Sequence, residues 1–341
     1  MHDPMETPVS VTESSQVAEA RRHAVRVAQA SDLSETLQGK AALVVTEAAT
    51  NLVKYGRGGY VLVRPYAEPL AHGLEILVLD QGPGIARIEE SLDDGFSTGG
   101  TLGYGLGAIA RLSSQFEIYT AAGAGTAIMA RLDDERRPAE PVRRKPPLAV
   151  GGVTTPKSGQ EACGDAWSCR WADGTFWVAS VDGLGHGPQA ATAAAEAVRV
   201  FHAVDGGGSP YDVLRDAHKA LKATRGAVMA VAAIRPALGT MDFAGVGNIS
   251  AVLIQEHEQR RLSSMDGTLG YSVRAIREQS YSWTPSSMLV LASDGLSTRW
   301  NLGEQVALRA RHPSLVAAVL HRDYARGMDD ASVVVIKGLA P

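Results

Sequence analysis

The sequence predicts an α+β protein made of two domains. Its 341 residues exceed the size of one ordinary domain. The stretch 133–147 holds four prolines and nine charged residues, so it cannot bury an apolar face and is expected to be an extended linker. Helical and strand patterns alternate before this stretch, whereas strand patterns dominate after it. We therefore expect one domain over residues 9–132 and a second over residues 148–341.

The composition excludes several classes of protein. Lys and Arg number 33 against 37 Asp and Glu, a net charge of -4, which argues against nucleic acid or an anionic membrane as a partner. Two cysteines cannot build a disulfide framework. The N-terminus lacks a signal-peptide pattern, and no apolar run approaches the roughly 20 residues that span a bilayer. We expect a soluble, cytoplasmic protein.

In the first domain, helices are predicted over residues 14–30 and 35–55. The second helix has the stronger period, because six apolar residues share one stripe at roughly 100° per residue: Leu37, Ala41, Val44, Val45, Ala48 and Leu52. Strands are predicted over 60–66, 74–80, 116–120 and 126–131, with a helix over 107–113. This order predicts helices packed over one mixed sheet.

In the second domain, seven strands and three helices are predicted. The strands cover residues 167–171, 175–182, 227–235, 240–245, 251–255, 288–294 and 331–337, and the helices cover 189–204, 211–222 and 314–322. Residues 172–174, Ala-Asp-Gly, suit a hairpin turn. Layers of strands with a few long helices predict a β-sandwich flanked by helices.

Three polar residues mark one face of the second helix. Glu47, Asn51 and Lys54 are spaced i, i+4 and i+7, about a quarter turn from the apolar stripe. Carboxylate and amide oxygens are the ligands that Mg²⁺ prefers. Alone, the same three residues also fit a solvated helix flank.

Two glycine-rich segments follow. Asp80 ends an apolar strand and opens Asp-Gln-Gly-Pro-Gly, where an aspartate could accept a hydrogen bond from an exocyclic amine, although a capped glycine turn has the same residues. Residues 99–107 hold five glycines and run into a helix, where backbone N–H groups bind phosphate well. A Rossmann loop would follow its first strand directly, and here a polar segment of roughly 20 residues intervenes.

The order of EAATN, DQGPG and GYGLG resembles the GHKL ATPase family and, within it, the RsbT-like serine kinases of bacterial partner switching. The resemblance implies a GHKL (Bergerat) α/β sandwich that binds ATP with Mg²⁺. It implies that Glu47 is the general base, that Asn51 holds Mg²⁺ and that Asp80 reads the adenine amine. It also implies that further residues surround the base and phosphates: Lys54, Gly82, Gly84, Gly103, Gly105, Gly107 and Thr126.

Acidic residues recur at strand ends in the second domain. Asp182 and Asp294 each follow an apolar strand and precede glycine, while Asp165 lies in Cys-Gly-Asp and Asp329 and Asp330 are adjacent. Carboxylates brought together near buried strands repel, and a divalent cation is the simple remedy. For any single Asp-Gly pair, an ordinary turn is the alternative.

The set DGLGHG, SDGL and DDAS resembles the PP2C-like serine/threonine phosphatases of the SpoIIE and RsbX branch. The resemblance implies an αββα sandwich that binds two Mn²⁺ or Mg²⁺ ions. It implies that Asp182 bridges them as the catalytic ligand and that the Gly183 carbonyl also binds. It places Asp165 on one metal and Asp294 and Asp329 on the other, with Asp330 the less favoured member of its pair.

Together the two resemblances imply a partner-switching regulator that acts on a STAS-domain protein, within a larger partner-switching complex. We expect metal-dependent dephosphorylation of that partner, and phosphorylation of the same partner by the first domain. Two alternatives stay open. The first domain could be a non-catalytic, ATP-dependent regulator of the phosphatase, or a binding module in a chain with little turnover.

Overall fold

The computed structural model describes residues 7–68, 71–85, 88, 105–136, 147–204, 207–256 and 258–339. The described residues form two compact units, one up to Arg136 and one from Pro147 onward. In this part of the chain no helix has the length and apolar character needed to cross a membrane.

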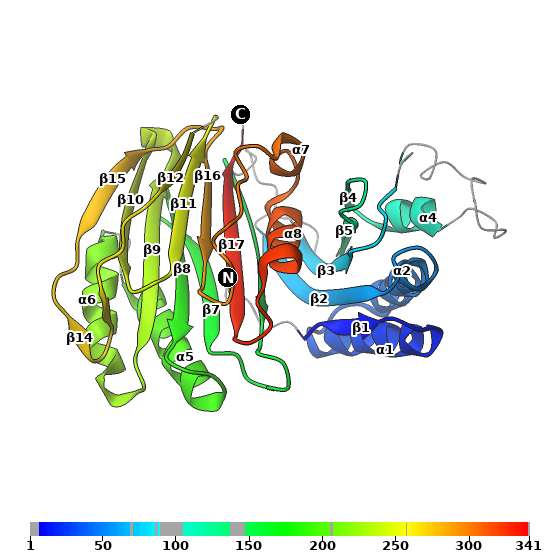
Figure 1. Ribbon diagram of the computed structural model, residues 1–341, viewed down its shortest axis with the longest axis horizontal. Helices are drawn as coiled ribbons and strands as arrows, with labels where there is room; N and C mark the ends of the chain where they lie inside the picture. Colours follow the sequence, from blue (N-terminus) through cyan, green and yellow to red (C-terminus); the bar gives the residue numbers. More distant parts are fainter. Residues whose placement is uncertain are drawn as a thin grey trace. The chain divides into compact units, whose positions relative to one another are not determined.

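The N-terminal unit is a layer of helices over one sheet (Figure 1). The strands lie in the order β1-β2-β3-β5-β4. The elements are β1 (Val9–Val11), α1 (Ser14–Ala30), α2 (Glu35–Lys54), β2 (Gly59–Glu68), β3 (Ala71–Asp80), α4 (Gly105–Leu112), β4 (Gln115–Thr120) and β5 (Thr126–Asp133). All pairs among these strands are antiparallel, so the prediction of a mixed sheet is wrong. Each pair here joins neighbours that run in opposite directions, and no parallel crossover is formed.

Apolar periodicity explains how α2 meets the sheet. The predicted stripe of α2 is buried, and the Ser34 hydroxyl caps the helix by accepting a hydrogen bond from the Leu37 N–H. The stripe packs with alternate residues of the strands, such as Val63, Ile76 and Ala130. The polar flank of α2 therefore lies away from the sheet.

The opposite face of the same sheet carries a buried ion cluster. Glu75 of β3 accepts hydrogen bonds from Arg64 Nε of β2 at 2.9 Å and from Arg131 Nε of β5 at 2.7 Å. All three side chains are at most 6% exposed. Each carboxylate oxygen thus meets one guanidinium across adjacent strands.

The expected linker starts later than predicted. Asp133 belongs to β5 and pairs with Gly73. The carboxylate of buried Asp134 accepts the Ser34 N–H at 2.8 Å and a hydrogen bond from Arg136. Residues 133–136 are therefore part of the folded unit, because polar contacts anchor them where apolar burial does not. Residues 137–146 lie outside the described residues.

The C-terminal unit contains two stacked sheets with helices outside them (Figure 1). One sheet has the order β15-β10-β9-β8-β7 and the other β12-β11-β16-β17-β6. Their strands are β6 (Leu148–Thr155), β7 (Asp165–Ala172), β8 (Thr175–Gly183), β9 (Ala227–Arg235), β10 (Thr240–Val246), β11 (Ser250–Gln255), β12 (Glu258–Arg261), β15 (Glu278–Ser282), β16 (Met288–Ala292) and β17 (Ala331–Gly338). The short strands β13 (Gly267–Thr268) and β14 (Ser272–Val273) form a separate hairpin.

Helices cover both outer faces of this sandwich. α5 (Pro188–Ala203) and α6 (Pro210–Ala220) pack on the β7–β10 side, and α8 (Pro313–Tyr324) packs on β6 and β17. A short helix, α7 (Val306–Arg309), precedes α8. Alternate residues of β8 serve two cores: Phe176 and Val178 face the other sheet, whereas Trp177 and Ala179 face α5 and α6. The unit is thus an αββα sandwich, as predicted.

Several strands were missed because their sequences lack an apolar alternation. β12 and β15 are polar strands at sheet edges. β6 contains Gly151 and Gly152, which are usual signs of a loop. Here they allow close packing, because a Cβ on Gly151 would stand 2.2 Å from the Ser314 backbone nitrogen and one on Gly152 would stand 2.6 Å from the Trp167 ring.

Candidate active sites

The N-terminal candidate site begins on the polar flank of α2. Glu47 is exposed and Asn51 is half-buried. A Cβ on Gly105, the first residue of α4, would stand 3.3 Å from Asn51 Nδ2 and 3.7 Å from Glu47 Oε2. Glu47 and Asn51 therefore both lie against the N-terminus of α4, where free backbone N–H groups favour an anion.

Asp80 forms the second part of this site at the end of β3. Its side chain is buried, and Oδ1 accepts hydrogen bonds from the N–H groups of Gly82 at 2.8 Å and Thr126 at 3.1 Å. Gly56, just after α2, packs on it so closely that a Cβ would stand 2.9 Å from Asp80 Cβ. Two backbone donors thus fix the orientation of the carboxylate.

The loops around Asp80 need glycine. Gly84 and Gly125 both have φ of +75°, and the Gly125 N–H donates to the Gly82 carbonyl at 3.1 Å. A Cβ on Gly125 would stand 2.0 Å from the Asp80 carbonyl oxygen. The predicted residues Asp80, Gly82, Gly84 and Thr126 therefore lie together.

Three predicted residues of this site remain: Gly107, Lys54 and Gly103. Gly107 is buried within α4. Lys54 is exposed at the end of α2, and no described residue forms a hydrogen bond or ion pair with it. Gly103 lies outside the described residues.

The C-terminal candidate site is a group of carboxylates around Asp182. Asp165 starts β7 and Asp182 lies near the end of β8, where the antiparallel ladder pairs the two residues. Asp165 is buried, and its Oδ2 atom has no hydrogen-bond partner among the described residues. Burial raises the pKa of Asp165 to about 7, against the opposing effect of the Ser293 hydroxyl.

The electrostatics of Asp182 show which acids surround it. Burial, and then the negative charges of Asp165, Asp294, Asp329 and Asp330 in that order, raise the pKa of Asp182 to about 9. The four predicted metal-ligand side chains and Asp330 are therefore close enough to repel one another. Such an excess of negative charge is the condition that a divalent cation relieves.

Asp294, Asp329 and Asp330 have different surroundings. Asp294 is exposed two residues after β16, and its Oδ2 accepts a hydrogen bond from Asn248 Nδ2 at 2.8 Å. Exposed Asp329 accepts the Asp330 N–H at 2.9 Å. The buried Asp330 carboxylate accepts the N–H groups of Lys157 and Gly164, each at 2.7 Å. Asp330 thus ties two backbone segments together.

Gly183 has no room for a side chain. A Cβ there would stand 2.2 Å from the Ala190 carbonyl oxygen at the start of α5. The Gly183 N–H also donates to the Gly164 carbonyl at 2.9 Å, which holds the segment before Asp165 beside the segment after Asp182. Close backbone approach, rather than a turn alone, explains this glycine of the Asp-Gly pair.

The residues present fit a divalent metal, although the described side chains form no ready-made cluster of three or more acidic, His or Cys ligands. The buried Asp165 oxygen without a partner and the raised pKa of Asp182 both mark groups that gain from a cation. The two cysteines contribute no ligand set: both are buried free thiols, and burial raises the pKa of Cys163 well above its usual range.

Sequence reasoning did not assign Asn248 or the role of Asp330. Asn248 follows β10 and is far from Asp294 in the chain, so only the fold brings them together. The glycine-rich stretch before Asn248 was the available signal. For Asp330, the adjacent pair of aspartates gave no sign that one carboxylate would accept hydrogen bonds from backbone N–H groups.

Comparison with known proteins identifies both units. Residues 10–132 match the family described as "Histidine kinase-like ATPase domain", and residues 172–338 match "Stage II sporulation protein E (SpoIIE)". The serine/threonine-protein kinase RsbT of Bacillus subtilis (strain 168) is 35% identical over 114 residues, which cover 33% of this chain and 86% of RsbT.

Solved structures match the fold of the C-terminal unit. A structure described as "The bacterial stressosome: a modular system that has been adapted to control secondary messenger signaling" is 28% identical, with a TM-score of 0.52, and the match covers 56% of this chain and 99% of that one. A crystal structure of RsbX in complex with magnesium is 18% identical with a TM-score of 0.51, and the match covers 58% and 98%. The predicted fold class is confirmed, as is the predicted fusion of a kinase-like and a phosphatase domain. The chain belongs to the RsbT-type serine/threonine-protein kinase family and joins that domain to a SpoIIE-type phosphatase domain of the PP2C fold.

Proposed function

We propose that this chain is a cytoplasmic partner-switching regulator that removes phosphate from phosphoserine or phosphothreonine on a STAS-domain protein in a metal-dependent reaction. Its N-terminal unit binds ATP with Mg²⁺ and phosphorylates the same partner, within a larger partner-switching complex. The observation that carries the phosphatase half is the group of four carboxylates around Asp182, with a buried oxygen of Asp165 left without a partner.

In the phosphatase reaction, Asp182 and the Gly183 carbonyl would hold two Mn²⁺ or Mg²⁺ ions, together with Asp165 for one metal and Asp294 and Asp329 for the other. The bound metals supply Lewis acidity and an acidified water at neutral pH. Asn248 orients the Asp294 carboxylate through its 2.8 Å hydrogen bond. Asp330 holds the backbone before Asp165 in place and is not a ligand in this scheme.

In the kinase reaction, Glu47 accepts the proton of the partner's hydroxyl as that oxygen attacks the γ-phosphorus of ATP, and ADP leaves. Glu47 is suited to this role because it is exposed and lies beside the N-terminus of α4. Asn51 would hold Mg²⁺ beside it. Asp80 is oriented by two backbone N–H groups and would accept a hydrogen bond from the adenine amine. Gly82, Gly84 and Thr126 would surround the base, and Lys54, Gly103, Gly105 and Gly107 would serve the phosphates.

A second candidate keeps only the phosphatase as an enzyme, with the N-terminal unit as an ATP-dependent regulatory or binding module. The placement of Glu47 beside Asn51 and Gly105 favours the bifunctional proposal, because a binding module has no need of a base at that position. Transfer of labelled phosphate from ATP to a STAS-domain protein distinguishes the two. The bifunctional proposal expects transfer by the wild type and loss of transfer in Glu47→Gln.

The phosphatase half is tested with the full chain and p-nitrophenyl phosphate in Mn²⁺, Mg²⁺ or EDTA, each with and without ATP. We expect release that requires metal and is lost in Asp182→Asn. Asp173→Asn is the matched control, because Asp173 is an exposed aspartate at the other end of the same β7–β8 hairpin. Full activity of Asp182→Asn would refute the metal assignment.

A further inference from the structure

The phosphatase site lacks an assigned group that attracts the substrate. Five carboxylates lie near one another there, whereas a phosphate monoester arrives as an anion. Metals neutralise part of this charge, but a positioned guanidinium adds a planar pair of donors that matches phosphate geometry. An arginine beside the site would therefore help to bind the substrate.

Arg225 precedes β9 at the end of the sheet where Asp182 lies. The β8–β9 ladder ends with Gly183 opposite Ala227, and the Leu184 N–H continues the pairing by donating to the Gly226 carbonyl at 3.0 Å. The next position along brings Arg225 to Gly185. Arg225 Nη1 stands 3.1 Å from where a Cβ on Gly185 would be. The guanidinium thus borders the loop that follows Asp182.

The backbone around Arg225 is held in place. The Thr224 hydroxyl accepts the Gly226 N–H at 3.0 Å and donates to the Leu221 carbonyl at 2.8 Å. Gly185 and Gly226 have φ of +87° and +79°, a region that disfavours side chains with a Cβ. The turn therefore presents Arg225 from a defined backbone.

The guanidinium itself is available. Arg225 is exposed, and none of the described residues forms a hydrogen bond or an ion pair with it. Other surface arginines differ in this respect: Arg199, for example, forms an ion pair with Glu196 at 2.7 Å. An unpaired arginine beside the loop of a carboxylate site is suited to an anionic ligand.

Two large, exposed apolar residues adjoin Gly226, the residue that follows Arg225. Leu184 follows Gly183 and is 48% exposed, and Tyr271, between β13 and β14, is 65% exposed. Tyr271 Cδ2 stands 2.8 Å from where a Cβ on Gly226 would be. Leu184 and Tyr271 therefore both lie beside Gly226, the residue that follows Arg225, and we call Leu184, Arg225 and Tyr271 the recognition surface.

We propose that Arg225 binds the phosphate of the phosphatase substrate, while Leu184 and Tyr271 contact apolar residues that flank the phosphoserine. This inference rests on the proposed phosphatase function and deepens it. Arg225 forms charge-assisted hydrogen bonds to the phosphate oxygens. The two apolar side chains are exposed in the free protein and become covered by the bound segment.

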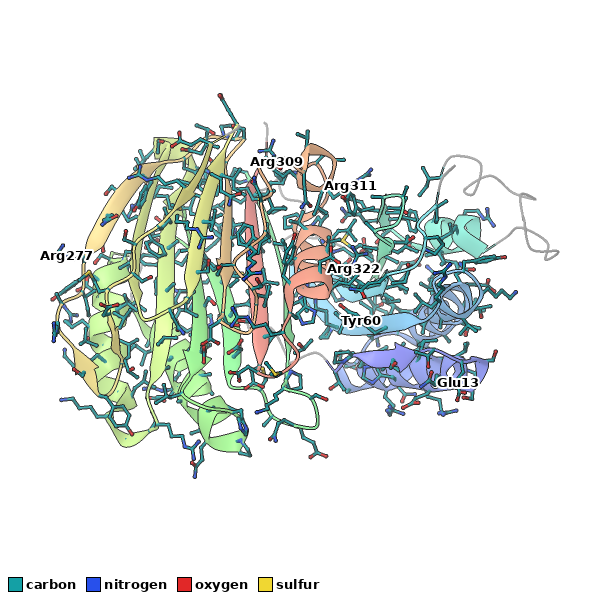
Figure 2. All side chains as sticks on the ribbon, in the orientation of Figure 1. Glu13, Tyr60, Arg277, Arg309, Arg311 and Arg322 are labelled. Atoms are coloured by element: carbon teal, nitrogen blue, oxygen red, sulfur yellow. The ribbon has the colours of Figure 1, made fainter. Side chains whose placement is uncertain are left out.

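The phosphate part is tested with inorganic phosphate as a competitive inhibitor of p-nitrophenyl phosphate release by the full chain in Mn²⁺. In Arg225→Ala we expect the inhibition constant for phosphate to rise about tenfold to a hundredfold, the range for hydrogen bonds to a charged group. Arg225→Lys should recover part of the loss, and the Mn²⁺ concentration for half-maximal activity should not change. Arg277→Ala is the charge-matched control, because Arg277 is exposed in the segment before β15 (Figure 2).

The flank part is tested with two phosphoserine peptides, one with leucine and one with glycine on either side. The wild type should prefer the leucine peptide in kcat/KM, and Leu184→Ala combined with Tyr271→Ala should abolish the preference. Leu238→Ala is the control, since Leu238 is 71% exposed at the other end of β9. An unchanged preference in the double variant would refute this contact.

Failure of the inference and failure of the proposed function give different results. A wild type with no metal-dependent release refutes the function itself. An active wild type whose phosphate inhibition is unchanged in Arg225→Ala refutes only the role of Arg225. If Arg225→Ala unfolds, Arg225→Gln keeps the size of the side chain without its charge, and wild-type phosphate inhibition in Arg225→Gln would equally refute the role.

Discussion

Replacing Asp182 by asparagine should destroy the metal site and yet stabilise the metal-free C-terminal unit. The pKa of Asp182 rises from 3.8 to about 9 on folding, chiefly through burial and then through the neighbouring carboxylates. Folding therefore favours the protonated form. Below pH 3.8 the group is protonated in both states and costs nothing, and the penalty grows as the pH rises from there toward 9.

The size of this penalty at pH 7 follows from the difference between that pH and the unfolded pKa, 7 minus 3.8. Each unit is worth 1.36 kcal/mol, so the upper bound is about 4 kcal/mol. Asparagine is neutral at every pH and keeps the shape of the side chain. Allowing for relaxation around the site, we expect Asp182→Asn to stabilise the metal-free unit by about 2–4 kcal/mol at pH 7.

The assay is thermal unfolding in EDTA followed by tryptophan fluorescence. All five tryptophans lie in the C-terminal unit, at positions 167, 171, 177, 283 and 300, so the signal reports that unit alone. For a unit of this size the midpoint should rise by roughly 5–15 °C at pH 7, and the gain should vanish as the pH approaches 4. Excess Mn²⁺ should reverse the order, because only the wild type retains the bridging ligand.

Two results would refute this reasoning. One is a metal-free Asp182→Asn unit that melts at or below the wild-type temperature at pH 7. The other is a difference that does not change with pH, which would mean that charge at this position is not the cause. Asp173→Asn should leave the midpoint unchanged at every pH, because Asp173 is an exposed turn residue.

Three other substitutions test the remaining contacts. Glu47→Gln should keep ATP affinity within about twofold, while the rate of phosphate transfer falls by a factor of roughly 10² or more. Equilibrium binding measures the affinity and single-turnover transfer measures the rate. Glu35→Gln on the same helix is the control. Glu75→Gln should destabilise the N-terminal unit by about 3–5 kcal/mol because two buried guanidiniums lose a charged partner, measured by calorimetry, and a loss under 1 kcal/mol would contradict a buried ion cluster. Asp330→Ala should destabilise the C-terminal unit by about 1–3 kcal/mol for each backbone N–H left unpaired, followed by tryptophan fluorescence, and an unchanged midpoint would show that Asp330 does not tie those segments.

Elements with a strong apolar pattern were predicted nearly to the residue. Strands β8 and β9 are apolar runs buried on both faces, and the hydrophobic stripe of α2 marks its whole length. The strands that were not predicted are stabilised by contacts other than an apolar pattern of their own. β15 is held by backbone pairing with β10, and β6 carries glycines where α8 approaches the sheet. Neither cause leaves a local signal in the sequence.

The candidate sites show the same division. Asp165 and Asp182 were chosen from motifs, and their pairing across β7 and β8 follows from a hairpin that the sequence indicated. The hydrogen bond from Asn248 to Asp294 and the placement of Arg225 beside Gly185 join segments that are distant in the chain. Such contacts depend on the order of strands in the sheets, which a single sequence does not reveal.

Fusion of the two domains in one chain fixes the ratio of kinase sites to phosphatase sites. If both proposed reactions operate, every chain carries one kinase site and one phosphatase site, so the phosphorylated fraction of the partner at steady state depends on the two turnover rates and not on the amount of enzyme. With saturating ATP and Mn²⁺, the fraction should therefore stay constant when the chain is varied tenfold below the partner concentration, and only the time to reach it should change. Gels that separate the phosphorylated from the unphosphorylated partner measure this directly. Asp182→Asn should drive the fraction toward one and Glu47→Gln toward zero, whereas a wild-type fraction that changes with enzyme concentration would show that the two reactions do not share one pool of partner.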